Sequence, residues 1–204
     1  MIERLSWGIN SLFRKIAYRN FVRHPEVNDY ETNINVGGGF GLARTIDPLT
    51  QIFHVIRYMG MSRMPFASNF AIIDLGCGDG FMLKGFDFVG FKNLTGVELD
   101  RELADLASLN IPRAKIHCVD FSSSDFSGAL DRSTFAAAFA FNPAPATQLI
   151  SALKSIAAGG SFVLFLRNPK FWPEIISGND LEFEILGKPR NMVIARVSIN
   201  NQFN

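Results

Sequence analysis

The chain has 204 residues, which suits one domain with room for an N-terminal extension and is enough to bury a sizeable core. Apolar residues make up 48% of it and charged residues 19%, so an intrinsically disordered protein is excluded. The formal net charge of +1 gives no argument for a large nucleic-acid footprint, and the 20 phenylalanines suit an apolar or stacking pocket as well as a core.

Residues 1–24 are predicted to form a basic amphipathic helix. Apolar side chains recur there at spacings of three and four residues: Ile2, Leu5, Ile9, Leu12 and Ile16. With five basic residues and one acidic residue, this segment carries a net charge of +4, which leaves −3 for the rest of the chain. One interpretation is a helix that contacts a membrane surface or an anionic partner. We favour the simpler one, in which the helix packs on the domain and leaves its basic side in solvent.

Residues 25–48 have an irregular pattern. They include the glycine-rich segment 37–41, which fits a mobile lid over a binding site and a plain linker equally well. Residues 50–58 are expected to form a short helix. We therefore divide the chain into an N-terminal extension with this glycine-rich lid, residues 1–60, and a main domain, residues 61–204.

From residue 70 onward, apolar segments alternate with amphipathic ones. Strands are expected at 70–75, 94–99, 115–119, 134–141 and 161–166. Helices are expected near 80–88, 100–109, 146–157 and 170–177. A final pair of strands, 181–186 and 192–198, encloses a turn-rich segment typical of a hairpin. This order predicts an α/β fold: a seven-stranded, mostly parallel sheet flanked by helices, with an antiparallel C-terminal hairpin strand.

The first of these strands runs into a glycine turn, Gly76-Cys77-Gly78-Asp79-Gly80. Glycines at alternate positions remove the Cβ atoms from one side of the turn, so that a ligand can approach the backbone. A turn of this kind at the carboxyl end of a parallel strand is where open α/β sheets bind nucleotides. The spacing Gly-x-Gly-x-Gly differs from the Gly-x-Gly-x-x-Gly of dinucleotide-binding folds, which disfavours a nicotinamide-dependent oxidoreductase.

Acidic residues stand in or next to the ends of the first three strands. Asp74 precedes the glycine turn, and Glu98 ends the second strand, where a carboxylate can accept hydrogen bonds from both hydroxyls of a ribose. Asp100 is better placed to cap the helix that follows it. Asp120 ends the third strand, and taken alone it fits a loop acid that starts a turn equally well.

Asp74 and the glycine turn together resemble motif I of the class I S-adenosylmethionine-dependent methyltransferases, a Rossmann-like family. Asp120 and Phe121 resemble the pair that binds adenine in this family. The resemblance implies S-adenosylmethionine as the cofactor and a set of cofactor-binding residues at the strand ends. These are Asp74, Gly76, Cys77, Gly78, Gly80, Glu98, Asp120, Phe121 and Asn142.

The fourth strand leads into a second motif, Asn142-Pro143-Ala144-Pro145. It is similar to the Asn-Pro-Pro-aromatic motif IV of amino-methylating members, in which the asparagine holds a nitrogen nucleophile toward the methyl group. Here Ala144 stands in place of the second proline and Pro145 in place of the aromatic residue. The resemblance implies Asn142 as the catalytic residue and nitrogen as one candidate acceptor atom.

The resemblance therefore implies a methyltransferase whose acceptor, a small molecule or a protein, the sequence does not identify. The alternative is a non-catalytic cofactor-binding or interaction module with the same fold, docked to a membrane or a partner through residues 1–24. No metal site is expected, because the three histidines lack metal-ligand spacing.

The two cysteines, Cys77 and Cys118, do not form a CxxC pair. On strands separated by a third, their backbones would lie about 10 Å apart, too far for a disulfide. Together with an N-terminus that does not resemble a secretory signal, this favours a reducing, cytoplasmic setting. Peripheral contact with a membrane through residues 1–24 stays open.

Overall fold

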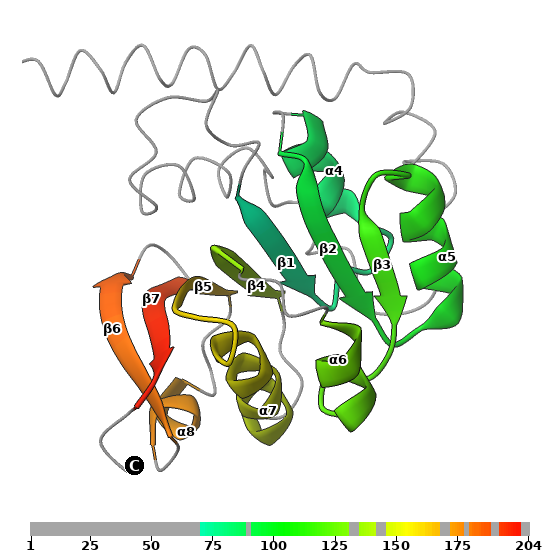
Figure 1. Ribbon diagram of the computed structural model, residues 1–204. Coiled ribbons are helices and arrows are strands. Elements are labelled where there is room, and N and C mark those ends of the chain that lie inside the picture. The colour runs from blue at the N-terminus through cyan, green and yellow to red at the C-terminus, as the bar shows by residue number, and fades with distance from the viewer. Residues whose placement is uncertain are drawn as a thin grey trace, which may run out of the picture. The chain divides into compact units, whose positions relative to one another are not determined.

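Figure 1 shows the computed structural model of the chain, and its element labels are used from here on. The structure describes residues 70–88, 91–130, 135–141, 146–167, 172–177, 180–188 and 192–200. Several predicted features lie outside these residues: the N-terminal helix, the glycine-rich segment 37–41, the helix 50–58, the division at residue 60, and Asn142 with the rest of its motif.

The described strands form one sheet. They are β1 (Ala71–Leu75), β2 (Asn93–Glu98), β3 (Lys115–Cys118), β4 (Ala137–Phe141), β5 (Phe162–Arg167), β6 (Leu181–Gly187) and β7 (Met192–Ile199). Their order is β3-β2-β1-β4-β5-β7-β6, and the neighbours from β3 to β5 pair in parallel. β7 pairs antiparallel with both β5 and β6. The predicted seven-stranded, mostly parallel sheet with an antiparallel C-terminal strand is therefore confirmed.

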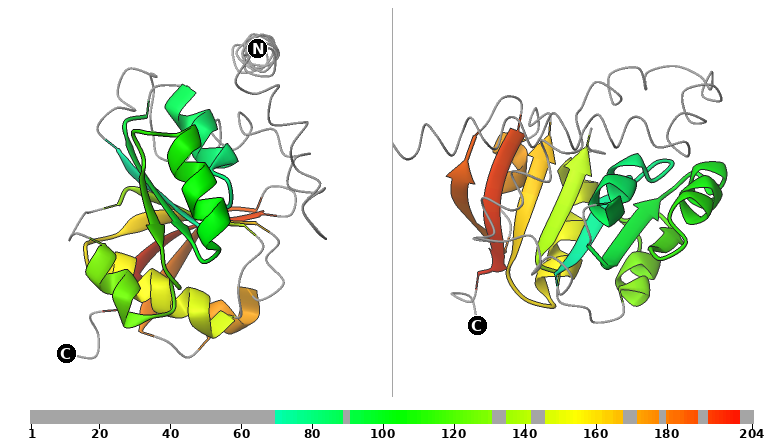
Figure 2. Two further views of the ribbon diagram at one scale, coloured as in Figure 1. Left: turned by 90° about the vertical axis from the view of Figure 1, so that its right-hand side faces the viewer. Right: turned by 90° about the horizontal axis from the view of Figure 1, so that it is seen from above.

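Helices cover both faces of this sheet. The described helices are α4 (Phe81–Phe88), α5 (Arg101–Asn110), α6 (Ser124–Ala129), α7 (Ala146–Ala157) and α8 (Trp172–Ile176). α4 and α5 lie on one face, whereas α6, α7 and α8 lie on the other (Figure 2). The sequence pattern does not predict α6, because its short segment SDFSGA is rich in serine and glycine, which favour turns over helices. The other four helices lie within a few residues of the predicted positions.

A row of buried phenylalanines holds α4 on the sheet. Phe86 of α4 packs against Phe91 and Phe139, with ring centroids 5.4 and 5.0 Å away. Phe139 of β4 stacks in turn on Phe165 of β5 at 4.8 Å. Burying such a side chain contributes roughly 1.5–3 kcal/mol. Because α4 starts directly after the glycine turn, this packing also fixes the direction in which the turn leaves β1.

Asp100 caps the N-terminus of α5, as the sequence predicts. Its Oδ1 accepts hydrogen bonds from the backbone N–H groups of Glu102 and Leu103, at 2.8 and 3.2 Å. These are two of the first backbone donors of the helix, which have no partner within the helix itself. The cap leaves Glu98, two residues earlier, available for another role.

Replacing the cap by Asp100→Ala is expected to lower the free energy of unfolding by about 1 kcal/mol, because two helix N–H groups lose their acceptor. Urea denaturation followed by circular dichroism measures this change. Asp105→Ala is the matched control, since Asp105 is an exposed acid within the same helix. An equal loss in both variants would show that the cap contributes nothing specific.

No described helix is long and apolar enough to cross a membrane. The predicted contact of residues 1–24 with a membrane or an anionic partner stays a prediction.

Candidate cofactor-binding site

The glycine turn lies on the end of β2. Gly76, Gly78 and Gly80 have positive φ angles of 79°, 56° and 83°. The N–H groups of Gly76 and Cys77 both donate to the carbonyl oxygen of Val97, at 2.8 and 2.9 Å. Left-handed backbone at three alternate positions explains why the turn needs glycine. The two hydrogen bonds to Val97 tie its first half to the carboxyl end of β2.

The three glycines of the turn serve two different purposes. A Cβ atom added to Gly76 or Gly78 would have no described atom within 4 Å, so this side of the backbone is clear. At Gly80 the added atom would lie 2.4 Å from Cδ1 of Ile111 and 3.3 Å from Cα of Ala107. The first two glycines can therefore face a ligand, whereas the predicted cofactor contact of Gly80 competes with a packing requirement against α5.

Glu98 points its carboxylate back at the glycine turn. Its Oε2 accepts a hydrogen bond from the N–H of Gly78 at 2.8 Å. Its Oε1 accepts from the N–H groups of Leu99 and Asp100, at 2.9 and 3.0 Å. Three backbone donors thus fix the orientation of the carboxylate, and charge-assisted bonds of this kind are the strong ones. A carboxylate has about four acceptor positions, so capacity for a further donor remains.

Asp74 is a buried acid near this carboxylate. It lies in β1 and is 2% exposed, and no hydrogen bond joins its side chain to another described residue. Burial, and secondly the negative charge of Glu98, raise the pKa of Asp74 to about 7. Two carboxylates without a cation between them repel each other. The site therefore favours a ligand that brings positive charge.

Cys77 lies buried within the turn. Burial raises the pKa of its thiol, and the charges of Asp74 and Glu98 raise it further. The thiol is therefore neutral and unreactive, and it donates a long hydrogen bond of 3.7 Å to the carbonyl oxygen of Gly78. Cys77 and Cys118 are both free thiols, as the sequence predicts.

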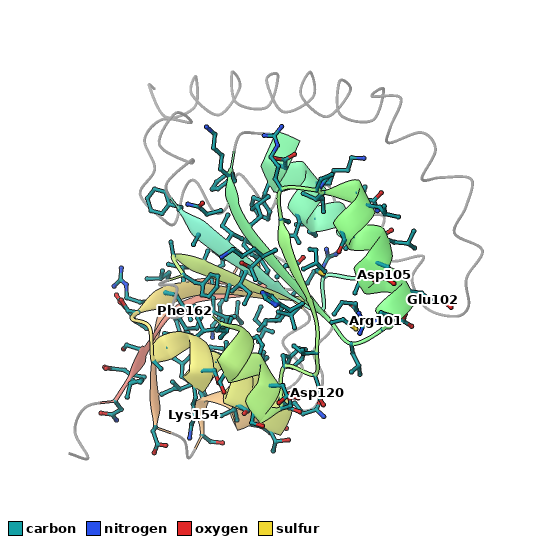
Figure 3. All side chains as sticks on the ribbon, turned by 45° about the vertical axis from the view of Figure 1, so that its right-hand side comes forward. Arg101, Glu102, Asp105, Asp120, Lys154 and Phe162 are labelled. Carbon is teal, nitrogen blue, oxygen red and sulfur yellow. The ribbon has the colours of Figure 1, made fainter. Side chains whose placement is uncertain are left out.

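Asp120 organises the turn that follows β3, next to the start of α6 (Figure 3). Its Oδ1 accepts from the N–H and the hydroxyl of Ser122, at 2.8 and 2.7 Å, and these bonds lower the pKa of Asp120. Its carbonyl oxygen accepts from both the N–H and the hydroxyl of Ser123. The turn-starting interpretation of Asp120 is thus correct, and its contact with adenine stays a prediction. Phe121 is half-buried and packs against the core.

The sheet brings these predicted residues to one edge. In the strand register, Leu75 of β1 lies opposite Val97 of β2 and Ala140 of β4, and Glu98 lies opposite Cys118 of β3. The chain therefore leaves β1, β2, β3 and β4 on the same side of the sheet. Asn142, the first residue after β4 in the sequence, lies outside the described residues.

Leu99 and Gly96 belong to the site region but do not stand out in the sequence pattern. Leu99 is 70% exposed directly after Glu98, so its apolar side chain lies open beside the site. The signal that could have found it is an apolar residue between two acids at a strand end. Gly96 lies in β2 beneath the turn, where a glycine inside a strand is the signal of a close approach.

Within the described parts of the chain, no group of three or more metal-ligating side chains occurs.

Comparison with known proteins agrees with this architecture. Residues 73–164 match the sequence profile of a family described as a methyltransferase domain. A putative methyltransferase from Escherichia coli, yhhF, is similar in structure, with a TM-score of 0.56 and 11% identity over 78% of this chain and 89% of that one. No curated protein matches the sequence significantly.

Two further solved structures are similar at 11% identity. The magnesium protoporphyrin IX methyltransferase from Synechocystis PCC 6803, with bound SAM, has a TM-score of 0.52 over 90% of this chain and 96% of that one. The ribosomal protein L11 methylase from Lactobacillus delbrueckii subsp. bulgaricus has a TM-score of 0.51 over 76% and 80%, respectively, at 11% identity. At this identity the likeness concerns the fold. Residues 73–164 therefore match a methyltransferase-domain family, and the described sheet and helices have the Rossmann-like fold of the class I S-adenosylmethionine-dependent methyltransferases.

Proposed function

We propose that this protein is an S-adenosylmethionine-dependent methyltransferase. The observation that carries the proposal is the convergence of a carboxylate and an open glycine turn: Glu98 and the N–H of Gly78 meet at 2.8 Å, beside backbone that no described side chain covers. This arrangement offers an acid for ribose hydroxyls next to a backbone that a bulky cofactor can reach. The match to a methyltransferase domain, and a similar structure with bound SAM, support the identity of the cofactor.

The charges and the exposed groups suit this cofactor, which carries a sulfonium and an ammonium cation. Asp74 would accept hydrogen bonds from the ammonium group, and Glu98 would use its remaining acceptor position for one ribose hydroxyl. Leu99 offers exposed apolar surface to the adenine ring. Phe121, the residue directly after Asp120, is the second apolar side chain proposed to contact this ring. The Oδ2 of Asp120, which makes no hydrogen bond to another described residue, would accept from the adenine amino group.

The reaction requires little covalent help from the protein. When bound, S-adenosylmethionine supplies an electrophilic methyl group on its sulfur. The chain binds and orients both reactants and excludes water, which can provide most of the acceleration. We propose that Asn142 holds the acceptor through its side-chain amide, which favours nitrogen in a small molecule or a protein. A general base is required only for a protonated or weakly nucleophilic acceptor.

Calorimetric titration of the full chain with S-adenosylmethionine and with its product S-adenosylhomocysteine tests the cofactor. We expect saturable binding of both, and no binding of either at millimolar concentration would refute the proposal. Transfer of labelled methyl groups to components of a cell extract then tests the reaction. Binding without any transfer would instead support the non-catalytic module, which no observation on the described residues favours.

We also propose that the protein works in the cytoplasm, because its two cysteines are free thiols. Whether residues 1–24 add peripheral contact with a membrane is tested by cosedimentation of the full chain with anionic and neutral vesicles. Sedimentation with the anionic vesicles alone is the result expected of a basic amphipathic helix.

A further inference from the structure

Gly96 of β2 lies in a space too small for any side chain. A Cβ atom there would lie 2.7 Å from Sγ of Cys77, 2.8 Å from Cδ1 of Ile116 and 2.8 Å from Cδ1 of Leu83. Carbon atoms in contact normally keep about 3.5–4.0 Å between them. Gly96 is not among the glycines with positive φ, so its backbone conformation is open to any residue. The glycine is therefore required for space.

The three neighbours of Gly96 differ in how easily they could move aside for a Cβ atom. Leu83 on α4 and Ile116 on β3 present the far ends of flexible side chains, which can rotate away. Cys77 has a single side-chain torsion, and its sulfur is bonded directly to the Cβ of a residue in the glycine turn. An atom placed at Gly96 would therefore push the turn itself away from β2.

The turn and β2 are joined immediately beside this contact. Val97, the residue after Gly96, accepts hydrogen bonds from the N–H groups of Gly76 and Cys77, and Glu98 accepts from the N–H of Gly78. A shift of a few tenths of an ångström between the turn and β2 lengthens all three bonds together. The third of them joins Gly78 to Glu98, so the shift moves the carboxylate away from the glycine backbone.

We propose that Gly96 and Cys77 are positioning residues for the cofactor: the bare backbone of Gly96 receives the thiol of Cys77, and this fit sets the distance between the glycine turn and the Glu98 carboxylate. The inference rests on the proposed function, because that distance matters only if one ligand contacts both groups. A small, neutral side chain is what the space beneath the turn accepts, and the buried thiol provides it.

Titration of the full chain with S-adenosylhomocysteine tests the proposal on Gly96→Ala, Cys77→Ala and the double variant. We expect Gly96→Ala to weaken binding about thirtyfold or more, and Cys77→Ala, which removes the fit without adding a clash, to weaken it about threefold. In the double variant the sulfur is gone, so affinity returns to within about threefold of Cys77→Ala. Gly128→Ala is the control, because a Cβ there meets nothing within 4 Å. Thermal unfolding without ligand separates loss of affinity from loss of folded protein.

Two results would overturn the inference. One is a Gly96→Ala protein that binds S-adenosylhomocysteine as tightly as the wild type, and the other is a double variant no better than Gly96→Ala. If Gly96→Ala does not fold, Cys77→Val enlarges the same contact from the side of the turn. It should also bind about tenfold more weakly, and unchanged affinity would contradict the proposal. Failure of the proposed function has a different signature, since the wild-type chain itself would then bind neither cofactor nor product.

Discussion

Asp74→Asn is expected to stabilise the ligand-free protein at pH 8 while weakening its binding of S-adenosylmethionine. Burial and the neighbouring Glu98 raise the pKa of Asp74 from 3.8 to about 7, so the folded protein at pH 8 holds an unfavourable buried charge. A shift of that size corresponds to about 4 kcal/mol, and burying the new amide donors returns about 1–3 kcal/mol of it. The expected net gain in the free energy of unfolding is therefore about 1–3 kcal/mol.

The gain must depend on pH in a defined way. The pKa of Asp74 is higher in the folded chain than in the unfolded one, so its stabilising effect is complete below pH 3.8 and is lost as the pH rises to about 7. Asparagine does not titrate. The stability difference between the variant and the wild type should therefore grow between pH 4 and 7 and level off above that. Urea denaturation at several pH values measures it.

The affinity for the cofactor should fall in Asp74→Asn, whereas the stability of the ligand-free protein rises. An ionised Asp74 attracts the cationic cofactor, and asparagine does not, so we expect about tenfold weaker binding at pH 8. Wild-type affinity should also fall as the pH drops from 8 to 6, because Asp74 takes up a proton, whereas the affinity of Asp74→Asn should show a smaller change. Asp105→Asn, at an exposed position of α5, is the control for both measurements. A stability gain that is the same at pH 5 and pH 8 would contradict the assignment of a raised pKa to Asp74.

Patterns that repeat along the chain could be predicted from the sequence, whereas details of packing could not. The alternation of apolar strands with amphipathic helices is a local property, so seven of the eight described elements from β1 to α7 can be recognised near their observed positions. The sequence pattern does not predict α6, because the segment SDFSGA has a low helix propensity. The turn before it is set by hydrogen bonds of Asp120 and Ser123, which only the structure shows. The position of β7 between β5 and β6 is a matter of tertiary pairing, which a hairpin signal alone does not determine.

The same division applies to the site. The acids at the strand ends can be found because motif spacing and strand ends are both visible in the sequence. The roles of the glycines cannot, because Gly76, Gly80 and Gly96 look alike until their neighbours are known. Gly76 faces open space, Gly80 faces α5, and Gly96 faces the thiol of Cys77. Distances of 2.4–2.8 Å from an added Cβ at the last two are properties of the packed structure alone.

Glu98→Gln is expected to lower the affinity for S-adenosylmethionine more than any substitution elsewhere on the sheet edge. One oxygen of the carboxylate accepts from the N–H of Gly78, and the other accepts from the N–H groups of Leu99 and Asp100. Glutamine has a single side-chain oxygen, so it can accept at only one of these two positions. Whichever way the amide turns, its NH2 group faces a backbone N–H. With the loss of a charge-assisted bond to ribose, this predicts about 10- to 100-fold weaker binding by calorimetry. Glu182→Gln, at an exposed position of β6, is the matched control.

The same substitution tests whether Glu98 and Asp74 act as one electrostatic unit. The negative charge of Glu98 contributes to the raised pKa of Asp74, so removing that charge must lower the pKa. The pH at which residual affinity for S-adenosylmethionine falls should then move to a more acidic value in Glu98→Gln than in the wild type. A loss of affinity with an unchanged midpoint would mean that Glu98 binds the ribose without influencing Asp74. Unchanged affinity would remove Glu98 from the site altogether, and with it the contact that orients the cofactor against the glycine turn.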